Sequence, residues 1–135
     1  MDPIERIYRE WDERSAKRDV EGLVALYAAD ATFESPLVRG LMHVDRGILR
    51  GHAELRAFFT QVPQRTPPGR GYYRNGYLTD GRLLFWEYPR ETPEGEQSDF
   101  AEVMEIADGR ILRHRVYWGW KNKWGQTPFI SRSVS

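Results

Sequence analysis

The stretch from Leu23 to Pro36 constrains the fold of this chain more than any other. Its residues, Leu-Val-Ala-Leu-Tyr-Ala-Ala-Asp-Ala-Thr-Phe-Glu-Ser-Pro, predict a helix that ends at Asp30 and is followed at once by a short strand. The strand ends at Ser35, because the ring of Pro36 disfavours helical backbone at the residue before it. The chain therefore changes from the helical to the extended hydrophobic repeat within this one block.

Apolar residues at helical spacing predict three helices. The first covers about residues 3–17, with Pro3 at its first position and Asp2 as its cap. The second is capped by Asp19 and runs into the block above, and the third starts at Gly51 and ends before Pro63. Their apolar faces carry, in turn, Ile4, Ile7, Tyr8 and Trp11; Val20, Leu23, Val24 and Tyr27; and Leu55, Phe58, Phe59 and Val62.

The rest of the chain predicts loops and strands. Residues 37–50 and 63–71 have the composition of loops. Four strands are expected at residues 72–78, 83–88, 99–106 and 111–120, joined by turns at 80–81, 93–95 and 108–109. We therefore expect one α+β domain over residues 1–135, in which a curved, mixed but mainly antiparallel sheet wraps around three helices as a cone with an internal pocket.

The composition excludes several partners and chemistries. Lys and Arg together number 20, as do Asp and Glu, so no net charge attracts nucleic acid or an anionic membrane. The absence of Cys excludes thiolate catalysis and Cys-ligated zinc. The chain shows neither an apolar signal core near Met1 nor an apolar run of the roughly 20 residues that span a bilayer. We expect a soluble cytoplasmic protein.

No cofactor or metal site is expected. The three histidines, His43, His52 and His114, lack the close spacing of a metal-ligand set. The Pro-Pro-Gly-Arg-Gly-Tyr-Tyr stretch at 67–73 is typical of a turn and does not match a nucleotide-binding loop.

Three stretches carry a resemblance to a known family. They are the block from Leu23 to Pro36, the run Gly-His-Ala-Glu-Leu-Arg-Ala-Phe-Phe at 51–59, and the run Asp-Gly-Arg-Ile-Leu-Arg-His-Arg-Val-Tyr-Trp at 108–118. Together they resemble the nuclear transport factor 2-like (NTF2-like) superfamily, most of all its SnoaL-like and ketosteroid-isomerase-like branch, over about residues 4–120. The resemblance implies the cone-shaped fold and a homodimer, but no single reaction, because this fold hosts several enzyme classes and also binding proteins.

The catalytic residues of the ketosteroid isomerases are only partly retained. By resemblance, Ser35 stands where those enzymes keep a carboxylate base, and Trp11 where they keep a tyrosine hydrogen-bond donor. Their neutral Asp corresponds to Asp99, or to Ala101 in the alternative register. Val116 occupies the position of an Asp in the epoxide-hydrolase-like members. We therefore expect neither steroid isomerisation nor epoxide hydrolysis.

His114 and one carboxylate are the candidates for proton transfer. Alternation along the last strand groups His114 with Trp118, and the resemblance implies that their face looks into the cone. An imidazole suits a general acid or base near neutral pH. Asp99 is the preferred carboxylate; Glu102 lies on the opposite face, so only one of the two should point inward, and Glu87 is a third candidate. The alternatives are a structural sheet histidine and solvated carboxylates.

Other residues complete the expected pocket. Either Glu34 or Ser35 should face it, and His43 in the long loop could belong to a lid or be an ordinary exposed residue. The aromatic wall is expected to contain Tyr8, Tyr27, Phe33, Phe58, Phe59, Trp86 and Trp118, for each of which simple core packing is the alternative.

These residues predict two kinds of function. The first is a cofactor-independent isomerase, cyclase or lyase that moves protons on a small hydrophobic carbonyl compound or a polyketide-like one. Asp99 and His114 would transfer protons, and Ser35 and Trp11 would donate hydrogen bonds. The second is a non-catalytic ligand-binding or dimerisation module that has lost its catalytic residues.

Overall fold

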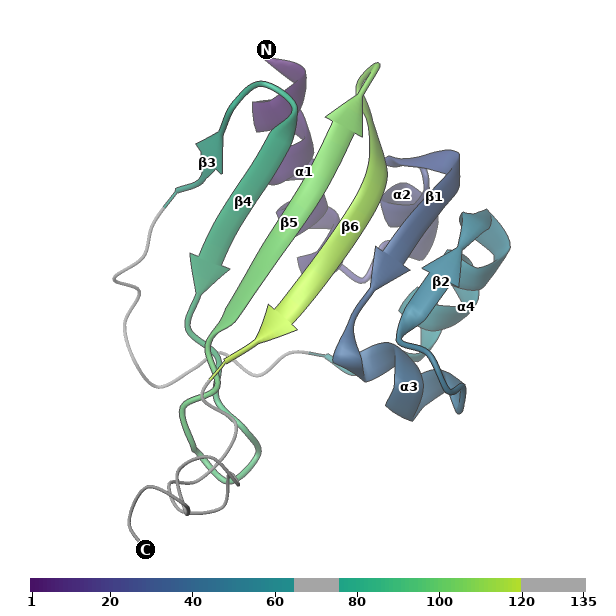
Figure 1. Ribbon diagram of the computed structural model, residues 1–135, viewed down its shortest axis with the longest axis vertical. Coiled ribbons are helices and arrows are strands. Elements are labelled where there is room, and N and C mark those ends of the chain that lie inside the picture. The colour runs from purple at the N-terminus through teal and green to yellow at the C-terminus, as the bar shows by residue number, and fades with distance from the viewer. Residues whose placement is uncertain (65–75, 120–135) are drawn as a thin grey trace, which may run out of the picture.

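One mixed sheet with helices on one of its faces forms the domain (Figure 1). The computed structural model describes residues 1–64 and 76–119 of the 135 residues. Six strands lie in the order β2-β1-β6-β5-β4-β3, and the β1–β6 pair is parallel while the other pairs are antiparallel. Helices α1, α2 and α4 lie behind the sheet in Figure 1, and the other face is turned to the viewer. The expected α+β fold is confirmed.

The two N-terminal helices are capped as their sequence predicts. Helix α1 (Pro3–Ala16) starts with Pro3, and the Asp2 carboxylate accepts the Ile4 N–H over 3.0 Å. Helix α2 (Val20–Val24) is capped by Asp19, whose carboxylate accepts the Gly22 N–H over 2.9 Å.

The prediction that this second helix continues to Asp30 is wrong. Helix α2 ends at Val24, and strand β1 (Tyr27–Glu34) has already begun at Tyr27. Tyr27 pairs with Ile111 of strand β6 (Arg110–Trp118), so pairing within the sheet overrides the helical spacing of the local sequence.

The loop predicted at 37–50 contains regular structure instead. Helix α3 (Pro36–Met42) follows β1 directly, since Pro36 fits the first turn of a helix as well as the end of a strand. The Ser35 hydroxyl caps α3 by accepting the Leu37 N–H over 3.2 Å. Strand β2 (Ile48–Arg50) then pairs antiparallel with β1. The described residues thus contain four helices rather than the three expected.

The remaining elements follow the predicted order. Helix α4 (Gly51–Gln61) precedes the short strand β3 (Leu78–Thr79), then β4 (Leu83–Tyr88) and β5 (Phe100–Ala107) lead to β6. Most of the strand expected at 72–78 and of the loop expected at 63–71 lies outside the described residues, as does the end of the strand expected at 111–120. None of the described helices is long and apolar enough to cross a membrane.

The core fills the space between the helices and the inner face of the sheet. Ile7 of α1, Leu55 of α4, and Leu84 and Met104 of the sheet are all fully buried there. Within this apolar core lie a buried histidine and a buried glutamate, His114 and Glu102. Polar groups at such depth are costly unless they are hydrogen-bonded.

Candidate active site

Five side chains form one line of hydrogen bonds on the inner face of the sheet, which we call the buried polar chain: Trp11, Tyr27, His114, Glu102 and Tyr88. The Trp11 Nε1–H donates to the Tyr27 hydroxyl over 3.1 Å. The Tyr27 hydroxyl lies 2.7 Å from His114 Nδ1, and His114 Nε2 lies 2.6 Å from Glu102 Oε1. The Tyr88 hydroxyl donates to Glu102 Oε2. The line therefore joins α1 to four different strands.

One arrangement of protons satisfies every member of the buried polar chain, and we assign it from the hydrogen-bond network. A neutral His114 with its proton on Nε2 donates to the Glu102 carboxylate and accepts the Tyr27 O–H at Nδ1. The Tyr27 oxygen remains free to accept the Trp11 N–H. The ionised Glu102 carboxylate accepts from both His114 and Tyr88. Each polar hydrogen then has one acceptor.

The strand register brings His114, Glu102 and Tyr88 together. Met104 pairs with His114 across β5 and β6, and Phe100 pairs with Tyr88 across β4 and β5. Because Glu102 lies between Phe100 and Met104 on the same face, both of its partners are diagonal cross-strand neighbours. Long side chains reach one another along such diagonals.

A β-bulge in the β5–β6 hairpin turns His114 inward. The register shifts after the Ile106–Ile111 pair and leaves Leu112 as the extra residue on β6. An uninterrupted ladder would put His114 on the outer face, because one residue of slip exchanges the two faces of a strand. The bulge is therefore what places an imidazole in the core.

The centre of the buried polar chain is shielded from solvent. The exposed fraction is 0% for Tyr27 and His114 and 2% for Glu102. Burial raises the pKa of Tyr27 well above its usual value of 10.0, and the negative charge of Glu102 adds to this shift, whereas the hydrogen bond from Trp11 opposes it. Tyr27 is therefore a neutral hydroxyl at physiological pH. It can pass a proton along its hydrogen bonds without becoming a stable anion.

Aromatic rings surround His114. Trp11 and Phe33 approach it edge-on, with ring centroids at 5.5 and 4.8 Å, and Trp86 lies at 6.3 Å. Phe58, Phe59 and Tyr8 form the next layer, in contact with Phe33 or Trp86. The structure thus brings together six of the seven residues predicted for the wall, Tyr27 included. The seventh, Trp118, stacks on Phe100 at 5.3 Å.

The other predicted site residues lie apart from the buried polar chain. Asp99 is 5% exposed, and its carboxylate accepts from Gln97 Nε2 over 3.0 Å and from the Arg90 N–H over 3.3 Å. No described hydrogen bond joins Asp99 to His114. Ser35 is buried as the cap of α3, while Glu87 is exposed on the outer face.

The sequence does not predict Tyr88 as a member of the buried polar chain, and it predicts Glu102 only as the alternative to Asp99. Glu102 was passed over in favour of Asp99, although the alternation of Phe100, Glu102, Met104 and Ile106 is the pattern of an inward face. Of the two carboxylates, Glu102 is the one that reaches His114. Tyr88 carried no signal of its own, since its role depends on the register of β4 against β5.

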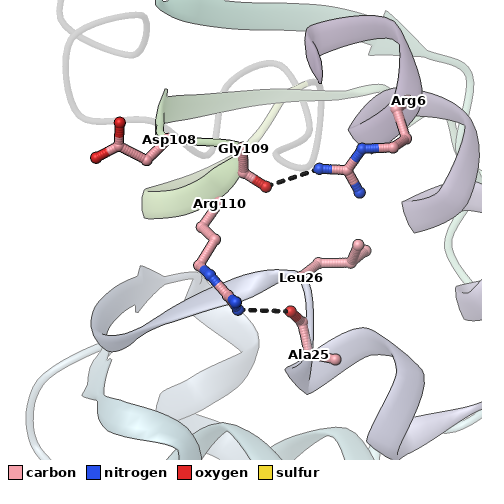
Figure 2. A pocket seen from close by; sticks show the side chains of 6 residues that line it. All are labelled: Arg6, Ala25, Leu26, Asp108, Gly109 and Arg110. Carbon is pink, nitrogen blue, oxygen red and sulfur yellow. Dashed lines mark hydrogen bonds between the residues drawn. The ribbon is translucent and has the colours of Figure 1, made fainter. Parts of the chain in front are cut away.

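Two hollows among the described residues lie away from the buried polar chain, which lines neither of them. Figure 2 shows the smaller one, of about 280 Å³, where Arg6 donates to the Gly109 carbonyl over 2.8 Å and Arg110 to the Ala25 carbonyl over 3.4 Å. The larger one, of about 630 Å³, lies beside α3 and includes the exposed His43. Within residues 1–64 and 76–119, no three His, Asp or Glu side chains are grouped so that they could hold a metal ion.

Comparisons with known proteins agree on the fold. The family model of the SnoaL-like domain matches residues 4–114. An NTF2-like protein of unknown function from Burkholderia pseudomallei is similar with a TM-score of 0.67 and 22% identity, over 87% of this chain and 92% of that one. A putative ketosteroid isomerase from Kribbella flavida gives a TM-score of 0.64 and 18% identity, over 90% and 81% of the two chains.

A third similar structure is that of a protein crystallised with a small molecule. TerC co-crystallised with polyporic acid gives a TM-score of 0.65 and 21% identity, over 86% of this chain and 91% of that one. No curated protein matches the chain. Identities this low show a common fold alone.

Proposed function

The chain belongs to the SnoaL-like domain family, and on that premise we propose that it is a small-molecule enzyme that transfers protons without a cofactor. The observation that carries this proposal is the His114–Glu102 pair, which is hydrogen-bonded at 2.6 Å inside an aromatic shell and extended by Tyr27. His114 is the base, Glu102 stabilises the imidazolium that forms, and Tyr27 relays the proton. The reactions open to such a site are isomerisation, cyclisation and elimination.

The proposed proton transfer starts at the Tyr27 oxygen, where the Trp11 N–H now donates, and continues along the existing Tyr27–His114 hydrogen bond. An acidic proton of the substrate passes to the Tyr27 oxygen as the Tyr27 proton passes to His114 Nδ1. The substrate is left as an anion, Tyr27 is neutral again, and His114 becomes an imidazolium beside the Glu102 carboxylate. Because Tyr27 only relays the proton, its raised pKa does not oppose the step. Return of the proton to another atom of the substrate completes an isomerisation.

The energetic cost of the buried pair supports a functional role. Two ionisable groups in a core are often no more stabilising than apolar residues of similar volume, because desolvation offsets their attraction. Stability alone therefore does not explain why this pair is kept in the core, whereas a role in proton transfer would. The aromatic shell favours a hydrophobic substrate, such as an aryl ketone or a polyketide-like compound.

One observation favours the second candidate, a non-catalytic binding module. All five members of the buried polar chain satisfy one another, so the network is complete without a ligand. A protein that had lost its catalysis could keep the same network to order its core.

The expected homodimer stays a prediction. Leu78 and Tyr117, at 70% and 54% exposed, are apolar or aromatic side chains that a second copy could cover.

Proton exchange separates the two candidates. A panel of aryl ketones and 1,3-dicarbonyl compounds is incubated with the protein in D2O, and loss of the acidic C–H signal is followed by NMR. We expect at least one compound to exchange faster with the wild type, and His114→Gln to lower that rate by about 10²–10⁴-fold, the usual contribution of a general base. Glu105→Gln, a change on the outer face of the same strand as Glu102, is the matched control. Exchange at the same rate in the wild type and in His114→Gln would overturn the enzyme proposal.

A further inference from the structure

Trp11 is the one member of the buried polar chain that does not come from the sheet. Tyr27, His114, Glu102 and Tyr88 lie on strands and are at most 9% exposed, whereas Trp11 lies on α1 and is only half-buried. Its indole covers the Tyr27–His114 pair from the helix side. Of the five side chains, it is the one that can rotate toward solvent without opening the sheet.

The contacts of the Trp11 indole are those of a bound aromatic ligand. Its N–H donates to the Tyr27 hydroxyl over 3.1 Å, and its ring stands edge-on to His114 at 82° and to Trp86 at 61°. A flat ring with one hydrogen-bond donor at its edge would reproduce every one of these contacts. We propose that the Trp11 indole holds the place of the ligand, and that the ligand is a planar aromatic or conjugated compound with a hydroxyl or N–H donor.

The requirement for a donor follows from the proton arrangement. The Tyr27 proton is committed to His114 Nδ1, so the Tyr27 oxygen can only accept from whatever takes the place of Trp11. A ligand without an O–H or N–H leaves that buried oxygen unpaired and binds more weakly. This inference rests on the proposed function, because a ligand that takes the place of Trp11 meets the Tyr27 oxygen, which is the first atom of the proposed proton relay.

Indole and 1-methylindole are the probes, because they have the same ring system and differ in the donor. In the wild type, the Trp11 Nε1–H NMR signal, assigned by its absence in Trp11→Phe, should shift and exchange faster when indole is added. In Trp11→Ala, indole should bind about tenfold more tightly than 1-methylindole, the loss expected for one buried hydrogen bond. Indole should also bind to Trp11→Ala more tightly than to the wild type, because the Trp11 side chain no longer competes for the site.

Two double variants test the partner of the donor. Trp11→Ala with Tyr27→Phe should lose the preference for indole, whereas Trp11→Ala with Tyr117→Phe, the same change on the outer face, should keep it. Equal binding of indole and 1-methylindole to Trp11→Ala, failure of both to bind, or indole binding that leaves the wild-type Trp11 signal unchanged would each overturn the inference. If Trp11→Ala does not fold, the wild-type signal alone decides.

The two proposals fail separately. Displacement of Trp11 by indole without any proton exchange on the ketone panel would support the ligand site at Trp11 and overturn the proposed enzyme function. Proton exchange that depends on His114 while indole leaves Trp11 undisturbed would do the opposite.

Discussion

His114 and Glu102 face each other diagonally across β5 and β6, with 2.6 Å between Nε2 and Oε1, and neither is more than 2% exposed. The pair is held from both sides, by Tyr27 on the far nitrogen and by Tyr88 on the far oxygen. A charge at that depth is tolerated because all of its partners are fixed by strands. A change to any one of these residues therefore leaves a neighbouring buried group without a hydrogen-bond partner, which lowers the stability of the domain.

Glu102→Gln should destabilise the domain by about 1–3 kcal/mol, the cost of leaving a buried hydrogen-bonding group unsatisfied. The amide nitrogen of Gln cannot accept, so either the His114 Nε2–H or the Tyr88 O–H loses its acceptor. Glu105→Gln on the outer face removes ion pairs to partly exposed Arg113 and Arg115, which are worth at most about 1 kcal/mol. Urea unfolding of the two variants gives the comparison, and an equal loss in both would contradict the importance of the buried site.

Tyr27→Phe should cost about 2–4 kcal/mol of unfolding free energy. It removes one oxygen but takes away the partner of two groups, the buried His114 Nδ1 and the half-buried Trp11 N–H. The matched change Tyr117→Phe, at a residue that is 54% exposed, should stay within about 0.5 kcal/mol of the wild type. Thermal or urea unfolding measures both, and a mild effect of Tyr27→Phe would mean that the hydroxyl is not the centre of the network.

Much of the fold could be predicted from the sequence, because caps and turns are local signals. Asp2, Asp19 and the Asp108–Gly109 turn act where their sequence indicates. The start of β1 could not be predicted, since Tyr27 joins the sheet through β6, which lies more than eighty residues further along the chain. Such a pairing leaves no trace in the local pattern.

The candidate site could be predicted only in part, because some of its contacts depend on pairing between strands. The inward face of His114 rests on the resemblance, and the aromatic wall on helical and strand spacing. Alternation along β5 separates Glu102 from Asp99, but the pairing of Glu102 with His114 depends on the register between two strands. Helix α3 shows a different kind of ambiguity. Pro36 predicts the end of a strand, which the structure confirms, but the same residue also starts a helix.

The stability of the wild type should fall more steeply above pH 10 than that of Tyr27→Phe. Burial, aided by the charge of Glu102, raises the pKa of Tyr27 well above its usual value of 10.0. The unfolded chain then releases this proton near pH 10 while the native state keeps it, so the stabilising contribution is complete below pH 10 and is lost as the pH rises toward the native pKa. One proton corresponds to about 1.4 kcal/mol per pH unit. Urea unfolding between pH 9 and 11 measures both slopes, and parallel slopes would contradict the shift.

Ser35→Ala should lower the stability by about 1 kcal/mol and leave proton exchange on an active ketone unchanged. The Ser35 hydroxyl accepts the Leu37 N–H at the start of α3, and loss of an N-cap costs about that much. Ser35→Thr keeps the hydroxyl and should recover most of the stability. Unfolding and exchange rates are measured on the same three proteins. A fall in the exchange rate of Ser35→Ala, restored in Ser35→Thr without a matching change in stability, would instead give Ser35 the hydrogen-bonding role at the substrate that its position next to Pro36 predicts.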